Sequence, residues 1–258
     1  MSQELQDLKV AVIADGTVDA AEAAQIRALI FADDVIDTEE AEFLFEVNDA
    51  VSGNDNCPEW TALFVEALTA YVLADDTTPG VVDADETTFL INAIKGDDVV
   101  DATELALLVN LMVEAESCSD ELIAFTLEAV KAAVIADGVV DAEEVAMLRA
   151  VLFGSGGAAG AEIDRSEADM LFDINDATTD NEGHDAGWIE LFVEAISSHV
   201  LDDAESPNEI DEAEGDWLTG RIEGDDTYDA QEKALLANIK AKATKINGKL
   251  AFKMDMFA

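Results

Sequence analysis

One short unit recurs along the whole chain and restricts what the chain can fold into. It consists of an apolar or aromatic residue followed by Asp-x-x-Glu, and it occurs eight times in 258 residues. An aspartate at a helix N-cap accepts from the free amides of the first turn, and a glutamate three residues later accepts from the N-cap amide. Each unit therefore predicts the start of an α-helix. The aspartates are Asp19, Asp37, Asp83, Asp101, Asp141, Asp164, Asp211 and Asp229, and the glutamates are Glu22, Glu40, Glu86, Glu104, Glu144, Glu167, Glu214 and Glu232.

The second half of the sequence repeats the first. "FLFEVNDA" at 43–50 corresponds to "MLFDINDA" at 170–177, and "WTALFVEALTAYVL" at 60–73 corresponds to "WIELFVEAISSHVL" at 188–201. The offset between matching residues grows from 122 to 128 along the chain, and the second copy has an added "GSGGAAG" at 154–160. We interpret this pattern as a tandem duplication and expect two domains, residues 1–116 and 117–258.

Capping signals and apolar spacing together predict the helices. In the first half we expect six of them, at 3–14, 19–31, 37–50, 58–74, 83–95 and 101–115, and the second half repeats the pattern. No segment alternates as a β-strand does. The predicted fold is all-α, a tandem duplicated helical bundle with about six helices per half. One helical face carries Trp60, Leu63, Phe64, Ala67, Leu68, Tyr71 and Val72.

The charge balance limits the partners of the chain. With 59 acidic and 13 basic residues, its formal net charge is −46. Such a charge excludes direct binding to nucleic-acid phosphates or anionic membranes and favours hard divalent or trivalent cations, or a basic protein, as partners. Three explanations stay open: carboxylates that hold metal ions, adaptation to high salt, and imitation of nucleic acid for a basic client.

Targeting and redox signals are few. The N-terminal "MSQELQDLKV" has no basic leader, and no run approaches the roughly 18 apolar residues of a membrane span, so we expect a cytoplasmic protein without a membrane span. Cys57 and Cys118 are too few for a disulfide framework.

Two segments match parts of the calcium loop of EF-hands, where oxygen ligands occupy positions one, three, five, nine and twelve around a glycine at six. Both have a proline, Pro79 or Pro207, at position five, so we expect modest affinity. The first, at 75–86, has Gly80 at position six, and the second, at 203–214, has Asn208 there. The candidate ligands are Asp75, Thr77, Asp83 and Glu86 in the first loop, and Asp203, Glu205, Asp211 and Glu214 in the second.

Two "ADG" corners match only the back half of such a loop. If Glu22 takes position twelve, Ala11 and Ile13 stand where the first two ligands belong. The same defect recurs in the second copy, so helix capping is the favoured explanation at any single corner. The remaining candidate ligands are Asp15, Asp19 and Glu22, and Asp137, Asp141 and Glu144.

Several single residues lead to narrower expectations. Arg27 and Arg149 occupy matching positions and should each pair with a carboxylate of another helix. His199 is expected to be a core histidine with one satisfied nitrogen, and His184 a loop residue. The segments 51–60 and 178–188, which do not preserve ligand identity, are interpreted as solvated loops. Asn48 and Asn175 are expected to bond the backbone at a helix end.

The last 27 residues are locally basic and hold six lysines. They predict either a final helix that offsets the acidic body or a docking tail whose anchors would be Phe252, Met254, Met256 and Phe257. No catalytic motif is present: the sequence lacks HExxH, GxSxG and phosphate-binding glycine loops, so we expect no enzymatic activity.

The segments "VIADGTVDAAEAAQIRALI" at 12–30 and "VIADGVVDAEEVAMLRAVL" at 134–152 resemble the TerB-like family, helical domains first associated with tellurite resistance. The resemblance implies an all-helical, internally repeated, non-catalytic protein linked to stress, with two TerB-like repeats. It also implies metal binding at the acidic corners formed by Asp15, Gly16 and Glu22 and by Asp137, Gly138 and Glu144.

The sequence thus favours a non-enzymatic, acidic helical protein that binds calcium or a similar hard cation through its Asp/Glu corners, foremost at 75–86 and 203–214. The alternative is an acidic protein-interaction scaffold, salt-adapted or mimicking nucleic acid, without a specific metal site.

Overall fold

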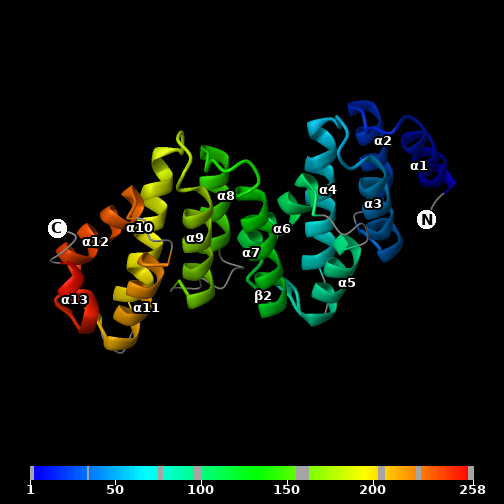
Figure 1. Ribbon diagram of the computed structural model, residues 1–258. Helices are drawn as coiled ribbons and strands as arrows, with labels where there is room; N and C mark the ends of the chain where they lie inside the picture. The colour runs from blue at the N-terminus through cyan, green and yellow to red at the C-terminus, as the bar shows by residue number, and fades with distance from the viewer. Residues whose placement is uncertain are drawn as a thin grey trace. The chain divides into compact units, whose positions relative to one another are not determined.

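The chain is all-α, as predicted. A computed structural model of the protein describes residues 3–33, 35–74, 78–95, 100–154, 163–202, 207–224 and 228–254. These residues form thirteen helices and four two-residue strands (Figure 1). The chain divides into two compact units between Ala129 and Val130, a point that lies within a helix.

The first unit is built around one long central helix, Pro58–Leu73. Its elements are α1 (Gln3–Asp15), α2 (Ala20–Ile30), α3 (Thr38–Val51), α4 (Pro58–Leu73), β1 (Val81–Val82), α5 (Ala84–Ile94), α6 (Ala102–Glu114), β2 (Ser117–Cys118) and most of α7 (Asp120–Val134). Helices α2, α4 and α6 are successive neighbours, and α3 contacts both α1 and α5. The unit therefore has two layers of helices, with α4 also packed on α3.

From α8 on, the elements of the second unit follow the same order as α2 to α7 in the first. They are α8 (Ala142–Phe153), α9 (Arg165–Thr178), α10 (Ala186–Leu201), β3 (Glu209–Ile210), α11 (Glu212–Ile222), α12 (Ala230–Lys242), β4 (Lys245–Ile246) and α13 (Gly248–Met254). Helix α10 packs against α8, α9 and α12, and α13 packs against α11. The central helix of each unit thus has neighbours on three sides.

The apolar face predicted for α4 is the core of the first unit. Trp60, Phe64 and Leu68 are fully buried, and the rings of Phe45 and Phe64 meet edge-to-face at 5.2 Å. The second unit repeats this contact, with Phe172 and Phe192 at 5.1 Å. Burial of these large side chains supplies the main stabilising free energy of each unit.

The short strands were not predicted from the sequence. β1 pairs in parallel with β2, and β3 pairs in parallel with β4. Two residues are too few to show the apolar alternation by which a strand is recognised. Each pair joins the segment just before a helix, α5 or α11, to the segment just after the following helix, α6 or α12. The pair therefore forms only when these helices pack.

The basic C-terminal segment forms a final helix, α13. Each of Lys245, Lys249 and Lys253 forms an ion pair with an acidic residue of the second unit; these are Glu209, Asp216 and Glu223. Phe252 is 73% exposed and Met254 is buried. Met256 and Phe257 lie outside the described residues.

Candidate functional site

All eight Asp-x-x-Glu units form capping boxes, which confirms the helix starts predicted from them. At α2, Asp19 Oδ1 accepts from the amides of Ala21 and Glu22, both at 2.8 Å. Glu22 Oε2 in turn accepts from the amide of Asp19 at 3.0 Å. One oxygen of each carboxylate is therefore engaged by the backbone, and the two side chains satisfy the helix end without an ion.

Side-chain amides hold the two "ADG" corners. Gly16 and Gly138 have φ angles of +80° and +78°, a left-handed conformation that glycine adopts at least cost. Asn54 Nδ2 donates to the carbonyl of Gly16 at 2.8 Å, and Asn181 Nδ2 donates to that of Gly138 at 2.9 Å. The backbone oxygen of each corner thus already has a donor from another loop.

The candidate ligands of the second corner bond nearby backbone amides and do not converge on one point. Asp15 is the last residue of α1, and its side chain lies outside what the structure describes. Asp137 Oδ1 accepts from the amide of Val139 at 2.9 Å, while Asp141 and Glu144 form the capping box of α8. Burial, reinforced by the charges of Asp137 and Asp141, raises the pKa of the Glu144 carboxyl.

The loops at 51–60 and 178–188 form hydrogen bonds to the two "ADG" corners. The sequence did not predict this role. Asn56 Oδ1 accepts from the amide of Val18 at 2.9 Å. In the second unit His184 Nδ1 accepts from the amide of Val140 at 3.0 Å. Asparagine and histidine therefore make the same contact in the two units, because each side chain offers both an acceptor and a donor.

The expectation that Asn48 and Asn175 bond the backbone is wrong. Asn48 Nδ2 donates to Asp101 Oδ2 at 2.8 Å, and its Oδ1 accepts from Trp60 Nε1 at 3.2 Å. Asn175 Nδ2 donates to Asp229 at 2.5 Å. These buried amides are placed by tertiary packing beside the caps of α6 and α12, which the local sequence does not show.

The two calcium-like loops are described only in part. Asp75, Thr77, Asp203 and Glu205 lie outside the described residues. Asp83 with Glu86, and Asp211 with Glu214, form the capping boxes of α5 and α11. Burial raises the pKa of Glu86, whereas its hydrogen bond to Asp83 lowers the pKa of Asp83. Among the described residues, no three His, Cys, Asp or Glu side chains are grouped as a metal site requires.

A groove runs along the surface of the first unit between α4 and α6, with a volume of about 940 Å³. The sequence alone did not predict this groove. Small and aliphatic side chains of α4 form most of its lining. Residues from three successive turns of α6 line the other side. The lining residues are Pro58, Thr61, Ala62, Val65, Glu66, Thr69, Ala70, Leu73, Ala106, Asn110 and Glu114.

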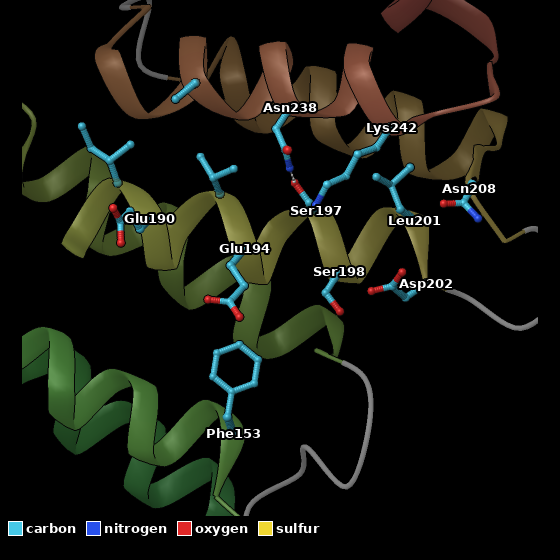
Figure 2. A pocket seen from close by; sticks show the side chains of 13 residues that line it. Phe153, Glu190, Glu194, Ser197, Ser198, Leu201, Asp202, Asn208, Asn238 and Lys242 are labelled. Carbon is cyan, nitrogen blue, oxygen red and sulfur yellow. Dashed lines mark hydrogen bonds between the residues drawn. The ribbon is translucent and has the colours of Figure 1, made fainter. Parts of the chain in front are cut away.

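The second unit has a groove at the corresponding place, between α10 and α12, with a volume of about 560 Å³ (Figure 2). Most of its lining residues lie 128 positions after lining residues of the first groove. They are Phe153, Ile189, Glu190, Val193, Glu194, Ser197, Ser198, Leu201, Asp202, Asn208, Ala234, Asn238 and Lys242.

Each groove has an asparagine–hydroxyl contact and, at its edge, an arginine–glutamate pair. Asn110 Nδ2 donates to Thr69 Oγ1 at 2.9 Å, and Asn238 Nδ2 donates to Ser197 Oγ at 2.7 Å (Figure 2). At the edge, the expected pairs of the two arginines are confirmed. Arg27 Nη2 lies 2.5 Å from Glu66 Oε1, and Arg149 Nη2 lies 2.9 Å from Glu194 Oε2.

A sequence signal for the grooves existed. An asparagine stands at matching positions in α6 and α12, within the otherwise apolar stretches "LLVNLM" and "LLANI". Such a residue on the apolar side of a helix needs a partner. That the partner is a hydroxyl on the neighbouring helix, and that small residues beside it leave a groove, depends on how the helices pack.

No protein family model matches the sequence, no curated protein is significantly similar to it, and no solved structure matches it significantly. None of the helices in the described part of the chain is long and apolar enough to cross a membrane.

Proposed function

We propose that this protein is a non-enzymatic scaffold that binds basic protein partners. The observation that carries this proposal is the recurrence of one groove, with one asparagine–hydroxyl contact and one arginine–glutamate pair, in both units. Helix capping alone does not require such a groove. A net charge of −46 would attract cationic partners and speed their encounter.

The polar groups most often used in catalysis have structural surroundings here. Burial raises the pKa of Cys118 to about 12 and also raises that of Cys57, so neither thiol is activated as a nucleophile. His199 Nδ1 lies 2.8 Å from the carbonyl of Ile163, and both nitrogens of His184 contact the backbone. These surroundings support a binding role over a catalytic one.

Selection from a library of random displayed peptides tests the proposal, using the full chain in about 0.15 M KCl. Competing polyglutamate removes peptides that are held by charge alone. A binding scaffold should enrich peptides that share a fixed spacing of basic and apolar residues. Peptides that share only their lysine and arginine content, or no enrichment above polyglutamate, would contradict the proposal.

Calcium binding at 75–86 and 203–214 is the second candidate function. It is favoured by the conformation at loop position six, where Gly80 has φ +82° and Asn208 has φ +60°, because a calcium loop turns sharply at that position. Calorimetry with calcium on chelator-stripped protein should then show saturable heat.

Two variants make the calcium test specific. Glu86→Gln and Glu214→Gln keep an acceptor for each capping box but remove the bidentate ligand of position twelve. The heat should be lost with both variants together, and potassium chloride should not replace calcium. If millimolar calcium produces neither heat nor a change in melting temperature, the loops do not bind it.

A further inference from the structure

We infer that the groove between α4 and α6 is the docking site for one amphipathic α-helix of a partner, with lysine or arginine beside its apolar face. The inference rests on the proposed binding function and identifies where and how that function operates. Four features of the first unit lead to it: the length of the groove, its apolar lining, its hydrogen-bond acceptors and its difference from the second groove.

The length and lining of the groove fit a helix of about four turns. Helix α4 has 16 residues and therefore extends about 24 Å. Val65 and Leu73 are half-buried along it, and the small side chains of Ala62, Ala70 and Ala106 leave the space above them open. A volume of about 940 Å³ accommodates several large apolar side chains.

A helix suits this groove better than an extended peptide does. An extended chain needs partners for its own amides and carbonyls, but the walls are helices whose backbone groups are bonded internally. The lining therefore offers side chains and no row of backbone partners. A docked helix satisfies its own backbone and buries the face formed by positions i, i+3, i+4 and i+7.

Two acceptors at one end of the groove, the amide oxygen of Asn110 and the carboxylate of Glu114, favour a basic partner. Asn110 donates one N–H of Nδ2 to Thr69, which orients the amide and leaves its oxygen available to accept. Glu114, one turn later, is the exposed last residue of α6 and has no ion pair among the described residues. Its carboxylate adds to the negative end of the helix dipole, where a lysine or arginine is stabilised.

The second groove differs in size and in the position of its charges, because a cation stands at this end while Glu190 and Asp202 line other parts of it. Lys242 stands where the first groove has Glu114, and Figure 2 shows its side chain reaching from α12 toward Ser197. A cation at this end disfavours the lysine or arginine of a basic helix there, and the space is smaller, about 560 Å³. One chain should therefore bind one helix.

The test uses a synthetic 18-residue peptide of leucine and lysine in amphipathic helical order. A peptide of the same composition, in an order without an apolar face, is the control for charge. Calorimetry with the full chain in about 0.15 M KCl should give one site for the amphipathic peptide and much weaker binding of the control.

Paired variants then locate the site. Val65→Asp places a carboxylate in the apolar floor of the first groove, and Val193→Asp does the same in the second. Both increase the negative charge, so general attraction would be strengthened by both. Docking in the first groove predicts that Val65→Asp weakens binding about tenfold or more, whereas Val193→Asp changes it less than about twofold.

Two variants of exposed residues test the same site in case Val65→Asp does not fold. Ala70→Trp fills the first groove from an exposed position without adding charge, and Glu114→Lys places a lysine where the second groove has Lys242. Each should weaken binding, with melting curves unchanged. Equal effects of Val65→Asp and Val193→Asp, or equal binding of the control peptide, would overturn the inference.

The outcomes separate this inference from the proposed function. If the peptide library yields a shared motif but the motif peptides bind Val65→Asp normally, the scaffold function stands and the groove assignment fails. If the chain instead dimerises through this groove, seen as a dimer in sedimentation that Ala70→Trp abolishes, the occupant is a second copy and the inference is also wrong.

Discussion

Glu167 shows how a capping residue can become sensitive to pH. Its side chain is fully buried, and its Oε2 accepts from the amide of Asp164 at 2.8 Å. Its Oε1 has no hydrogen-bond partner among the described residues. Burial raises its pKa from 4.5 to about 7, because the amide of Asp164 compensates only part of the lost hydration.

A raised carboxyl pKa destabilises the folded state as pH rises. Between pH 4.5 and about 7 the unfolded chain releases the proton of Glu167 while the folded chain keeps it, so stability falls through this window. The total loss is about 3 kcal/mol, complete above the folded pKa. Glu167→Gln should abolish this loss, because glutamine keeps the cap and carries no charge.

Urea unfolding at pH 5 and pH 8 measures the effect of Glu167→Gln. The variant should be more stable than the parent chain at pH 8 and nearly equal to it at pH 5. Glu40→Gln is the matched control: Glu40 holds the same place in the first unit, is only half-buried, and has a pKa raised by burial. Its substitution should change stability less, and an equal gain from both variants would contradict this account.

Because His184 and Asn56 make equivalent contacts in the two units, we expect an asparagine to replace His184 at little cost in stability. Each accepts from a partly buried amide, that of Val140 or Val18. His184→Asn should therefore keep most of the stability, whereas His184→Ala leaves the amide of Val140 unpaired and should cost about 1–3 kcal/mol. Denaturant unfolding of both variants checks this, with Asn56→Ala expected to match His184→Ala. Equal losses from His184→Asn and His184→Ala would refute the shared role.

At the scale of elements, the eight caps are alike in sequence but not in what surrounds them. Asp19 at α2 is exposed, whereas Asp101 at α6 also accepts from the buried Asn48. Asp229 at α12 accepts from both Asn175 and Thr179. A cap that also satisfies a buried amide ties its helix to the core of the unit.

Substitution of two caps should separate these roles. Asp19→Ala should cost about 1 kcal/mol, the usual value for a lost N-cap. Asp101→Ala should cost about 1–3 kcal/mol more, because it also leaves the buried amide of Asn48 without an acceptor. Chemical denaturation of the two variants gives the difference, and equal losses would show that Asn48 finds another partner.

Local chemistry explains how much of the fold could be predicted. A capping box acts within four residues, so Asp19 and Glu22 could be assigned from the sequence alone. The parallel pairs β1–β2 and β3–β4 could not, since each joins segments about 36 residues apart. The same holds for the groove, because Asn110 is a single polar residue in an apolar stretch and its partner Thr69 lies on another helix.

At the scale of the whole molecule, opposite charges compensate only a small part of the acidity. Nine of the 13 basic residues have ion pairs among the described residues, and most of these pairs are exposed, where each contributes little. The remaining carboxylates repel one another. The paired residues are Lys9, Arg27, Lys131, Arg149, Arg165, Arg221, Lys245, Lys249 and Lys253.

Repulsion between carboxylates makes the stability of the fold depend on salt concentration. Melting at a pH where the net charge is zero shows whether charge is the cause. From about 0.01 M to about 1 M KCl the screening length falls from about 30 Å to about 3 Å, so melting at pH 7 should shift upward by about 5 °C or more. Near pH 4.1, the isoelectric point, net charge vanishes and the shift should disappear. Calorimetric melting at the two pH values checks this. An equal rise at both would mean that salt acts through hydration of the surface, since screening has nothing to act on when the charges balance.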